Sequence, residues 1–145
     1  MANDVTESQQ AKKWLYDTLH GNVDIAASVG TNIFAGAVPS PRPTRYILYD
    51  LLAAADVHGV GSIRVLTQPL FQVRLVIEGW PDASARLVAK RIDDVLRSAK
   101  NQVSGDYVFS SEREQEIDRH EIDTSTNKHY HNLGGIYRLH TARTA

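Results

Sequence analysis

The clearest pattern in this sequence is an alternation of apolar and polar positions in the second half of the chain. In the run 70–78 an extended strand would have one apolar face and one polar face. The apolar face carries Phe71, Val73, Leu75 and Ile77, and the polar face carries Gln72, Arg74 and Glu78. This predicts a half-buried strand, with one side on a core and the other on water or a partner. The run 128–140 is similar in composition but contains Gly134 and Gly135, which we expect to permit a bulge or a close backbone approach.

Helical spacing of apolar residues predicts two main helices. The first follows a capping box at Thr6–Gln9 and ends at Gly21, with Ala11, Trp14, Leu15 and Leu19 on one face. The second spans 81–100, and its apolar face carries Ala85, Val88, Ile92, Val95, Leu96 and Ala99. A short extra helical turn is expected over 23–29, ended by Gly30.

The remaining apolar runs predict short strands separated by proline-, glycine- or charge-rich connections. We expect strands near 32–37, 46–55, 62–68, 107–117 and 128–140, and loops at 38–43, 56–61 and 118–127. Pro69 lacks an N–H, so it belongs at a bulge or on an edge strand. The predicted fold is a single α+β domain over residues 1–145, with one antiparallel-rich sheet and two main helices packed on one face. The other face of the sheet would be open for assembly.

Composition narrows the functional classes. The chain has 145 residues, 42% of them apolar, a net charge of −1 and no cysteine. The near-neutral charge is atypical of a small domain that binds DNA phosphates, and the lack of cysteine excludes disulfides and cysteine-based sites. The polar, acidic start of the chain and the lack of a long apolar run predict a soluble protein made in a cytoplasm, with no membrane partner.

The order of elements resembles the tail-completion or tail-terminator family of long-tailed bacteriophages. The segments that carry the resemblance are 29–34, the proline-rich link, the strand 68–76, the helix around 89–96, the strand around 110–114 and the ending 133–138. The resemblance implies a virion protein of the tail or neck, assembled in the bacterial host cytoplasm, with neither catalytic residues nor cofactors. It further implies a ring, usually of six copies, that ends the tail tube, joins it to the head-side connector and lets DNA pass through its lumen. A head-completion or neck protein on the connector side is the alternative.

Four alternating carboxylates form a candidate acidic stripe. Glu112, Glu114, Glu116 and Asp118 would share one face of a regular strand. Like charges side by side destabilise a sheet, so the stripe must be hydrated or meet cations. One interpretation is a solvated edge that discourages aggregation. The other is a negative wall of the ring lumen, along which DNA slides without sticking.

Three histidines form a second candidate site. His129 and His131 share a strand face, and His120 could approach them across the hairpin, so a metal-dependent enzyme is a further alternative. Polar strand histidines are the simpler interpretation. For Trp80 we expect packing at the helix entry, with a role as an interface anchor as the alternative.

Two loops and one helix face are the candidate contact surfaces. The loops are the proline-rich link 38–43 and the connection 118–127, whose candidate contact residues are Pro39, Pro41, Arg42, Pro43, Asp123, Thr124 and Asn127. The basic residues of the second helix (Arg86, Lys90, Arg97 and Lys100) are expected to be exposed, with contact to an acidic partner ring as the alternative.

Overall fold

The computed structural model describes residues 7–58, 64–105 and 107–143. The described helices are α1 (Glu7–His20), α2 (Val23–Val29) and α3 (Ala83–Arg97). The strands are β1 (Ile33–Ala35), β2 (Arg45–His58), β3 (Arg64–Glu78), β4 (Gln102–Ser104), β5 (Tyr107–Asp123) and β6 (Lys128–Arg143). The α+β prediction is therefore confirmed, as are the two main helices and the short third one.

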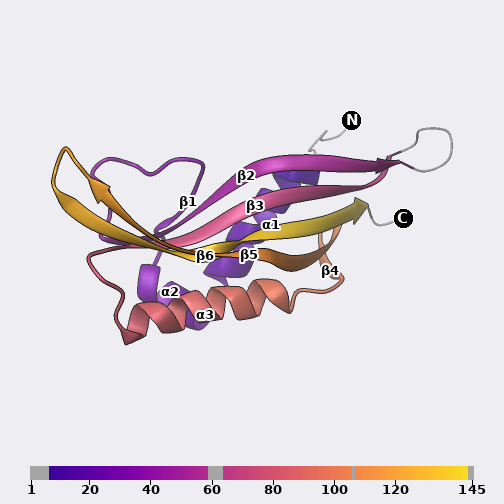
Figure 1. Ribbon diagram of the computed structural model, residues 1–145. Coiled ribbons are helices and arrows are strands. Elements are labelled where there is room, and N and C mark those ends of the chain that lie inside the picture. The colour runs from indigo at the N-terminus through magenta and orange to yellow at the C-terminus, as the bar shows by residue number, and fades with distance from the viewer. Residues whose placement is uncertain (1–6, 59–63, 106, 144–145) are drawn as a thin grey trace.

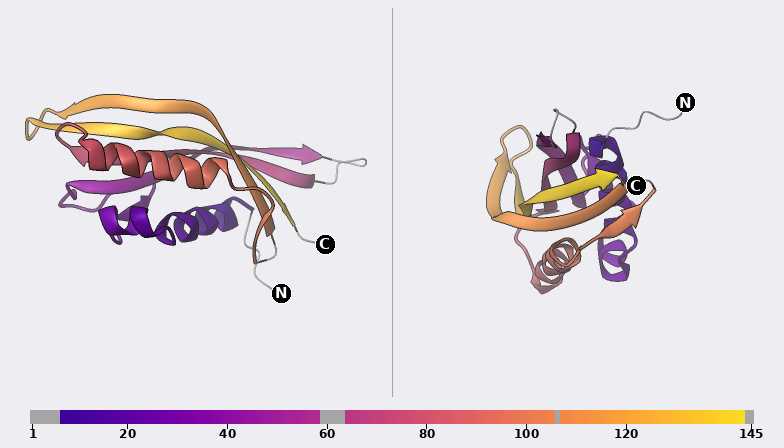
Figure 2. Two further views of the ribbon diagram at one scale, coloured as in Figure 1. Left: turned by 90° about the horizontal axis from the view of Figure 1, so that it is seen from below. Right: turned by 90° about the vertical axis from the view of Figure 1, so that its right-hand side faces the viewer.

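The strands form one six-stranded sheet in the order β1-β2-β3-β6-β5-β4. Every neighbouring pair is antiparallel except β1 with β2. The three helices lie on one side of this long, curled sheet (Figures 1 and 2). We call this side the helix face and the other side the outer face.

The main core lies between the helices and the helix face. Phe71, Val73, Leu75 and Ile77 of β3 are all buried in it, which confirms their predicted common face. The apolar sides of α1 and α3 cover them, and Trp14 stacks on Phe109 of β5 with 5.2 Å between ring centroids. The apolar periodicity read from the sequence thus accounts for the layer that holds the helices on the sheet.

The outer face is open over much of the sheet but is covered at one end. Tyr46, Leu48, Val76 and Tyr130 form a second buried cluster there, with Phe34 and Val38 packed on it. Val38 belongs to the proline-rich link, so the link folds back over the sheet. The expectation of a wholly open second face is therefore wrong at this end, because the apolar residues on that side needed a cover.

The Gly134–Gly135 pair allows the strands of the curled sheet to approach closely. A Cβ on Gly134 would lie 2.0 Å from the Val73 carbonyl oxygen, and one on Gly135 would lie 2.7 Å from the Gln115 carbonyl oxygen. The pairing of β5 with β6 shifts by one residue between Arg113 and Gln115 at the same level. The predicted close backbone approach is confirmed, and it sits beside a β-bulge.

Several predicted boundaries are wrong. Asp56–His58 continues β2, and Asp118–Asp123 continues β5, so the turn between β5 and β6 is only residues 124–127. Both segments carry turn-favouring or charged residues, but each pairs along its length with an already formed strand. β4 was not predicted, since three exposed or half-buried residues give no periodic signal.

Pro69 lies inside β3, an interior strand, and not on a sheet edge. Paired residues between β3 and β6 are interrupted between Thr67 and Leu70, where a missing N–H costs no ladder bond. Thr6 of the proposed capping box and the loop 59–61 lie outside the described residues. No helix in the described ranges is long and apolar enough to cross a membrane.

Candidate functional site

Two stretches of strand lie at open edges of the sheet within the described residues. β1 pairs only with Ile47–Tyr49 of β2, and β4 pairs only with Tyr107–Phe109 of β5. Beyond those short strands, β2 from Asp50 and β5 from Ser110 to Asp123 have a sheet neighbour on one side only. Outward-facing backbone N–H and C=O groups along such edges are available to another chain, except at Ser111, whose N–H donates to Ala99 and whose carbonyl accepts from Lys100.

The two edges differ in chemistry. The β2 edge reads Asp50-Leu-Leu-Ala-Ala-Ala55, and the side chains of Leu52 to Ala55 are exposed. The β5 edge carries eight charged residues between Ser110 and Asp123, namely Glu112, Arg113, Glu114, Glu116, Asp118, Arg119, Glu121 and Asp123. Both edges carry a β-bulge, at Glu114 in β5 and at Leu52 in β2. Charged side chains oppose uncontrolled pairing along the β5 edge, whereas Leu51–Ala55 of the β2 edge carries no charge.

The bulge divides the predicted acidic stripe between the two faces. Glu112 lies opposite Arg138 on the outer face, while Glu116 and Asp118 lie opposite Gly135 and Leu133, on the helix face. The prediction that all four carboxylates share one face is therefore wrong. The register shift at Glu114, which strict alternation cannot reveal, is the reason.

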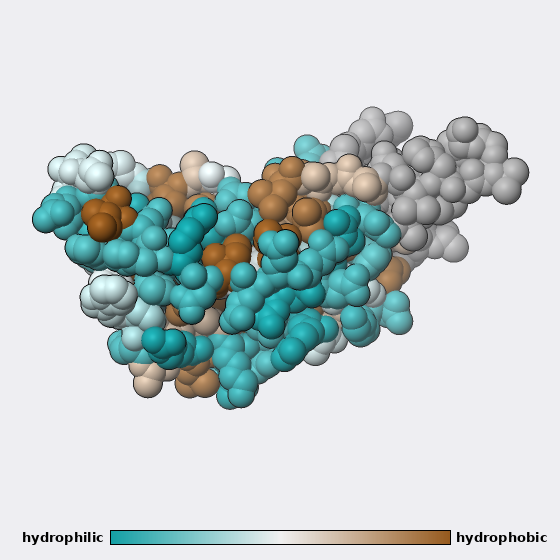
Figure 3. All heavy atoms as spheres, viewed as in Figure 1, coloured by the Kyte–Doolittle hydropathy of each residue, from teal (hydrophilic) through white to brown (hydrophobic). Residues whose placement is uncertain are grey.

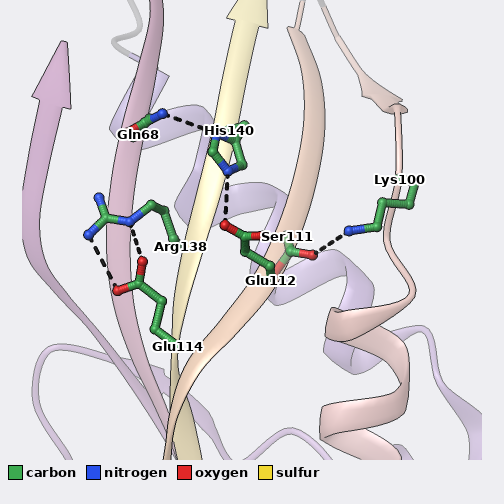
Figure 4. A network of polar contacts seen from close by, with 7 residues as sticks. All are labelled: Gln68, Lys100, Ser111, Glu112, Glu114, Arg138 and His140. Atoms are coloured by element: carbon green, nitrogen blue, oxygen red, sulfur yellow. Dashed lines mark hydrogen bonds and ion pairs between the residues drawn. The ribbon is translucent and has the colours of Figure 1, made fainter. Parts of the chain in front are cut away.

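The outer-face carboxylates are paired with cationic or imidazole side chains (Figure 4). Glu114 accepts from Arg138 at 2.5 Å and 3.4 Å, and this hydrogen bond lowers the pKa of Glu114. Glu112 lies 3.5 Å from His140 Nε2, and His140 Nδ1 lies 3.3 Å from the Gln68 amide. This part of the surface is a paired polar network and not a bare acidic wall.

Arg42 clamps the proline-rich link onto the long hairpin. Its guanidinium donates to Glu121 at 2.6 Å and to the Tyr46 hydroxyl at 2.7 Å, and lies 3.6 Å from the centre of the Tyr130 ring. Burial alone would raise the pKa of Glu121, but the hydrogen bond and charge of Arg42 outweigh it and lower that pKa. Arg74 lies next to this clamp and binds Asn132 at 3.1 Å.

The two predicted contact loops therefore meet at one end of the molecule (Figure 1). In the link Pro39 and Pro41 are exposed, whereas Arg42 and Pro43 are half-buried. At the hairpin tip Thr124 and Asn127 are exposed, and the Asp123 carboxylate accepts from Ser125, which lowers the pKa of Asp123. Sequence alone gave no sign that these loops are neighbours, because 79 residues separate Arg42 from Glu121.

The three histidines also come together, but not as a metal-binding set. His120 Nε2 and His129 Nδ1 are hydrogen-bonded at 2.9 Å, while His131 Nε2 is bonded to Asp118 at 2.7 Å. Among the described side chains no group of three or more His, Asp or Glu residues is placed to hold a metal ion. Three of their six ring nitrogens are bonded in this way, and the arrangement gives no support to the alternative of a metal enzyme built on these histidines.

Trp80 lies over these histidines. Its ring stacks on His120 with centroids 5.0 Å apart, and 71% of its surface is exposed. The expected packing at the helix entry is wrong, because the apolar face of α3 is already filled by its own aliphatic residues. The sequence offered one hint, a large aromatic at a turn.

A cleft of about 320 Å³ separates α3 from β5 and β6. At its base Tyr137 donates to Asp93 at 2.9 Å, and Arg113 and Arg97 lie 3.5 Å and 3.3 Å from the same carboxylate. Burial, and then this hydrogen bond, strongly raises the pKa of Tyr137. Sequence reasoning missed this group, although Asp93 was the one acid on an otherwise basic helix face. Arg86, Lys90, Arg97 and Lys100 are exposed, as predicted.

No family model matches the sequence, and no curated protein matches it. A chain in the solved structure of the virion of a native gene transfer agent (GTA) particle does match the fold. The TM-score is 0.68, the match covers 97% of this chain and 99% of that chain, and the identity is 17%. At this identity the likeness establishes a shared fold over nearly the whole of both chains.

Proposed function

We propose that this chain is a structural subunit of a phage-like particle, a tail terminator that acts by assembly and not by catalysis. The observation that carries the proposal is the fold shared end to end with a chain of a gene transfer agent virion. The match extends over 97% of this chain and 99% of that chain. Fold alone does not fix function, so the surfaces must supply the mechanism.

The surfaces support a subunit built to meet others. The β2 edge offers unpaired backbone groups along its uncharged stretch Leu51–Ala55. The proline-rich link and the β5–β6 hairpin tip project together at one end. Exposed apolar residues on the face seen in Figure 3 form small separate patches, as expected of a chain that stays dissolved until it joins the particle. Head-to-tail contacts that close into a ring leave no free end, and a closed ring stops further growth of the tail tube. In the tail-terminator family that the sequence resembles, the ring usually has six copies.

In such a ring the outer face would line the lumen through which DNA passes. Glu112 and Glu114 lie on it. Arg138 neutralises Glu114, and Glu112 faces the imidazole of His140, so these four side chains together carry at most one net negative charge. A wall of this kind neither collects phosphates, as a basic surface would, nor repels them strongly. Reversing Glu112 and Glu114 to lysine should slow DNA ejection while rings still form. Unchanged ejection by particles carrying this double variant would exclude a lumen role.

Deleting the gene in a particle-producing strain separates the terminator from the neck alternative. A terminator limits tube growth, so its loss should give tails of uncontrolled length that are not joined to heads. Loss of a connector-side protein should instead give tails of normal length beside unjoined heads. Negative-stain microscopy of the lysate distinguishes these results, and normal joined particles would contradict both roles. A plasmid copy of the gene is the control.

A further inference from the structure

Trp80 belongs to an aromatic platform on the helix face at the hairpin end. It stacks on His120 with an interplanar angle of 11°, and His120 stacks on His129 with an angle of 16°. Ile122 pairs with His129 across the hairpin and is half exposed. These four side chains (Trp80, His120, Ile122 and His129) make a flat surface whose rings are held in place by one another. We call it the aromatic platform.

The exposed part of the proline-rich link has the complementary chemistry. Pro39, Ser40 and Pro41 are exposed and uncharged, and the residues on either side of them are anchored. Val38 packs on the outer-face cluster, and Arg42 is held by Glu121 and two tyrosine rings. A proline-rich segment fixed at both ends loses little conformational entropy on binding, and aromatic surfaces are its usual partners.

We infer that the aromatic platform of one copy binds the Pro39–Ser40–Pro41 segment of a second copy. This inference rests on the proposed function, because it names the contact between neighbouring subunits. Within one molecule the platform lies on the helix face and the link on the outer face, so the sheet separates them. Each copy therefore presents the platform on its helix face and the link on its outer face. Contacts between two different surfaces of neighbouring copies are heterologous, and such contacts can close a ring.

The electrostatics are consistent with this pairing. The exposed link segment has no charged side chain, and the platform has none when its histidines are neutral. On the same face, the Asp118 carboxylate beside the platform is bonded to His131. Contact between two uncharged surfaces avoids the cost of removing water from an unpaired charge.

The test is a titration of the labelled full chain with a peptide of residues 37–44, followed by the two tryptophan indole N–H signals. A peptide with alanine in place of its three prolines is the control. Trp14 is buried and bonded to Gln102, so it serves as an internal reference. The proline peptide should shift the Trp80 signal saturably, with a Kd on the order of 1 mM for so small a contact, and leave the Trp14 signal in place. The alanine peptide should not shift either signal.

Two variants sharpen the result. Trp80→Ala should weaken peptide binding, followed by the Ile122 methyl signals, about tenfold or more. Val103→Ala removes an equally exposed apolar side chain far from the platform and should leave binding unchanged. If the proline peptide shifts nothing, or the alanine peptide shifts Trp80 equally, the inference is overturned.

Together with the gene deletion, the peptide titration distinguishes failure of this contact from failure of the proposed terminator role. Overlong tails after deletion, together with a peptide that does not bind, would overturn this contact and leave the terminator role standing. Saturable, proline-dependent binding to the platform, with normal joined particles after deletion, would support the contact and remove the terminator role.

Discussion

The two faces of the sheet are built on different principles although they share the same strands. On the helix face alternate side chains of β3 are buried against α1 and α3, and the contacts that hold this layer together are apolar. On the outer face the same strand presents Gln72 and Arg74 to partners that are mostly polar or charged. The strand 70–78 therefore has two roles. One face holds the helices on the sheet, and the other combines a small buried cluster around Val76 with polar side chains at the surface.

The largest effect should come from truncating the helix face. Phe71→Ala removes a fully buried ring and should lower the free energy of unfolding by about 3–5 kcal/mol. Ile136→Ala, half-buried on the outer face, is the matched control and should cost about 1 kcal/mol. Denaturant unfolding followed by tryptophan fluorescence measures both. Equal losses in the free energy of unfolding would mean that both faces contribute to stability in the same way.

The next largest loss of stability is expected at Gly134, where β6 approaches β3 closely. Gly134→Ala places a methyl group against the Val73 carbonyl and should cost about 1–3 kcal/mol through backbone displacement. The unfolding midpoint and the amide exchange rates of β3 and β6 report it. An unchanged midpoint would mean that the sheet can relax there without cost.

The clamp on the outer face should contribute less. Arg42→Ala loses the bonds to Glu121 and Tyr46 and the contact with the Tyr130 ring, for a total of about 1–2 kcal/mol. Arg91→Ala, which breaks only the exposed pair with Asp24, is the control and should change stability by less than about 0.5 kcal/mol.

The stability that Arg42 contributes through Glu121 should depend on pH. The folded-state pKa of Glu121 is lowered, so its contribution is present above its ordinary pKa of 4.5 and is lost as pH falls through the lowered value. The stability gap between wild type and Arg42→Ala should therefore be constant at neutral pH and narrow below pH 4.5. A gap that widens in acid would contradict this pairing.

The smallest effect is expected at the exposed network of Figure 4. Glu114→Gln keeps the shape of the side chain and removes its charge from the hydrogen bond with Arg138. Stability should change little, because exposed ion pairs are screened by water and salt. A double-mutant cycle with Arg138→Gln measures the coupling, and a large, salt-independent coupling would show that this surface also supports the fold.

Much of the helix face could be predicted from sequence, because apolar periodicity is a local signal. The spacing of Ala85, Val88 and Ile92 is enough to orient α3. The outer face and the candidate site could not be predicted in the same way. The extension of β5 through Asp118–Asp123 depends on pairing with β6, and the bulge at Glu114 depends on its neighbours in space. The meeting of Arg42 with Glu121 is likewise a product of topology, and no local pattern encodes it.

We propose that copies of this chain form a closed ring at the end of a phage-like tail. A cryo-electron microscopy reconstruction of particles from the producing strain tests it most directly. We expect a ring of copies of this chain between tail tube and head connector, with the β2 edge and the proline-rich link in contact with neighbouring subunits. Particles that lack this chain, or that carry it as isolated copies with that edge facing solvent, would contradict the claim.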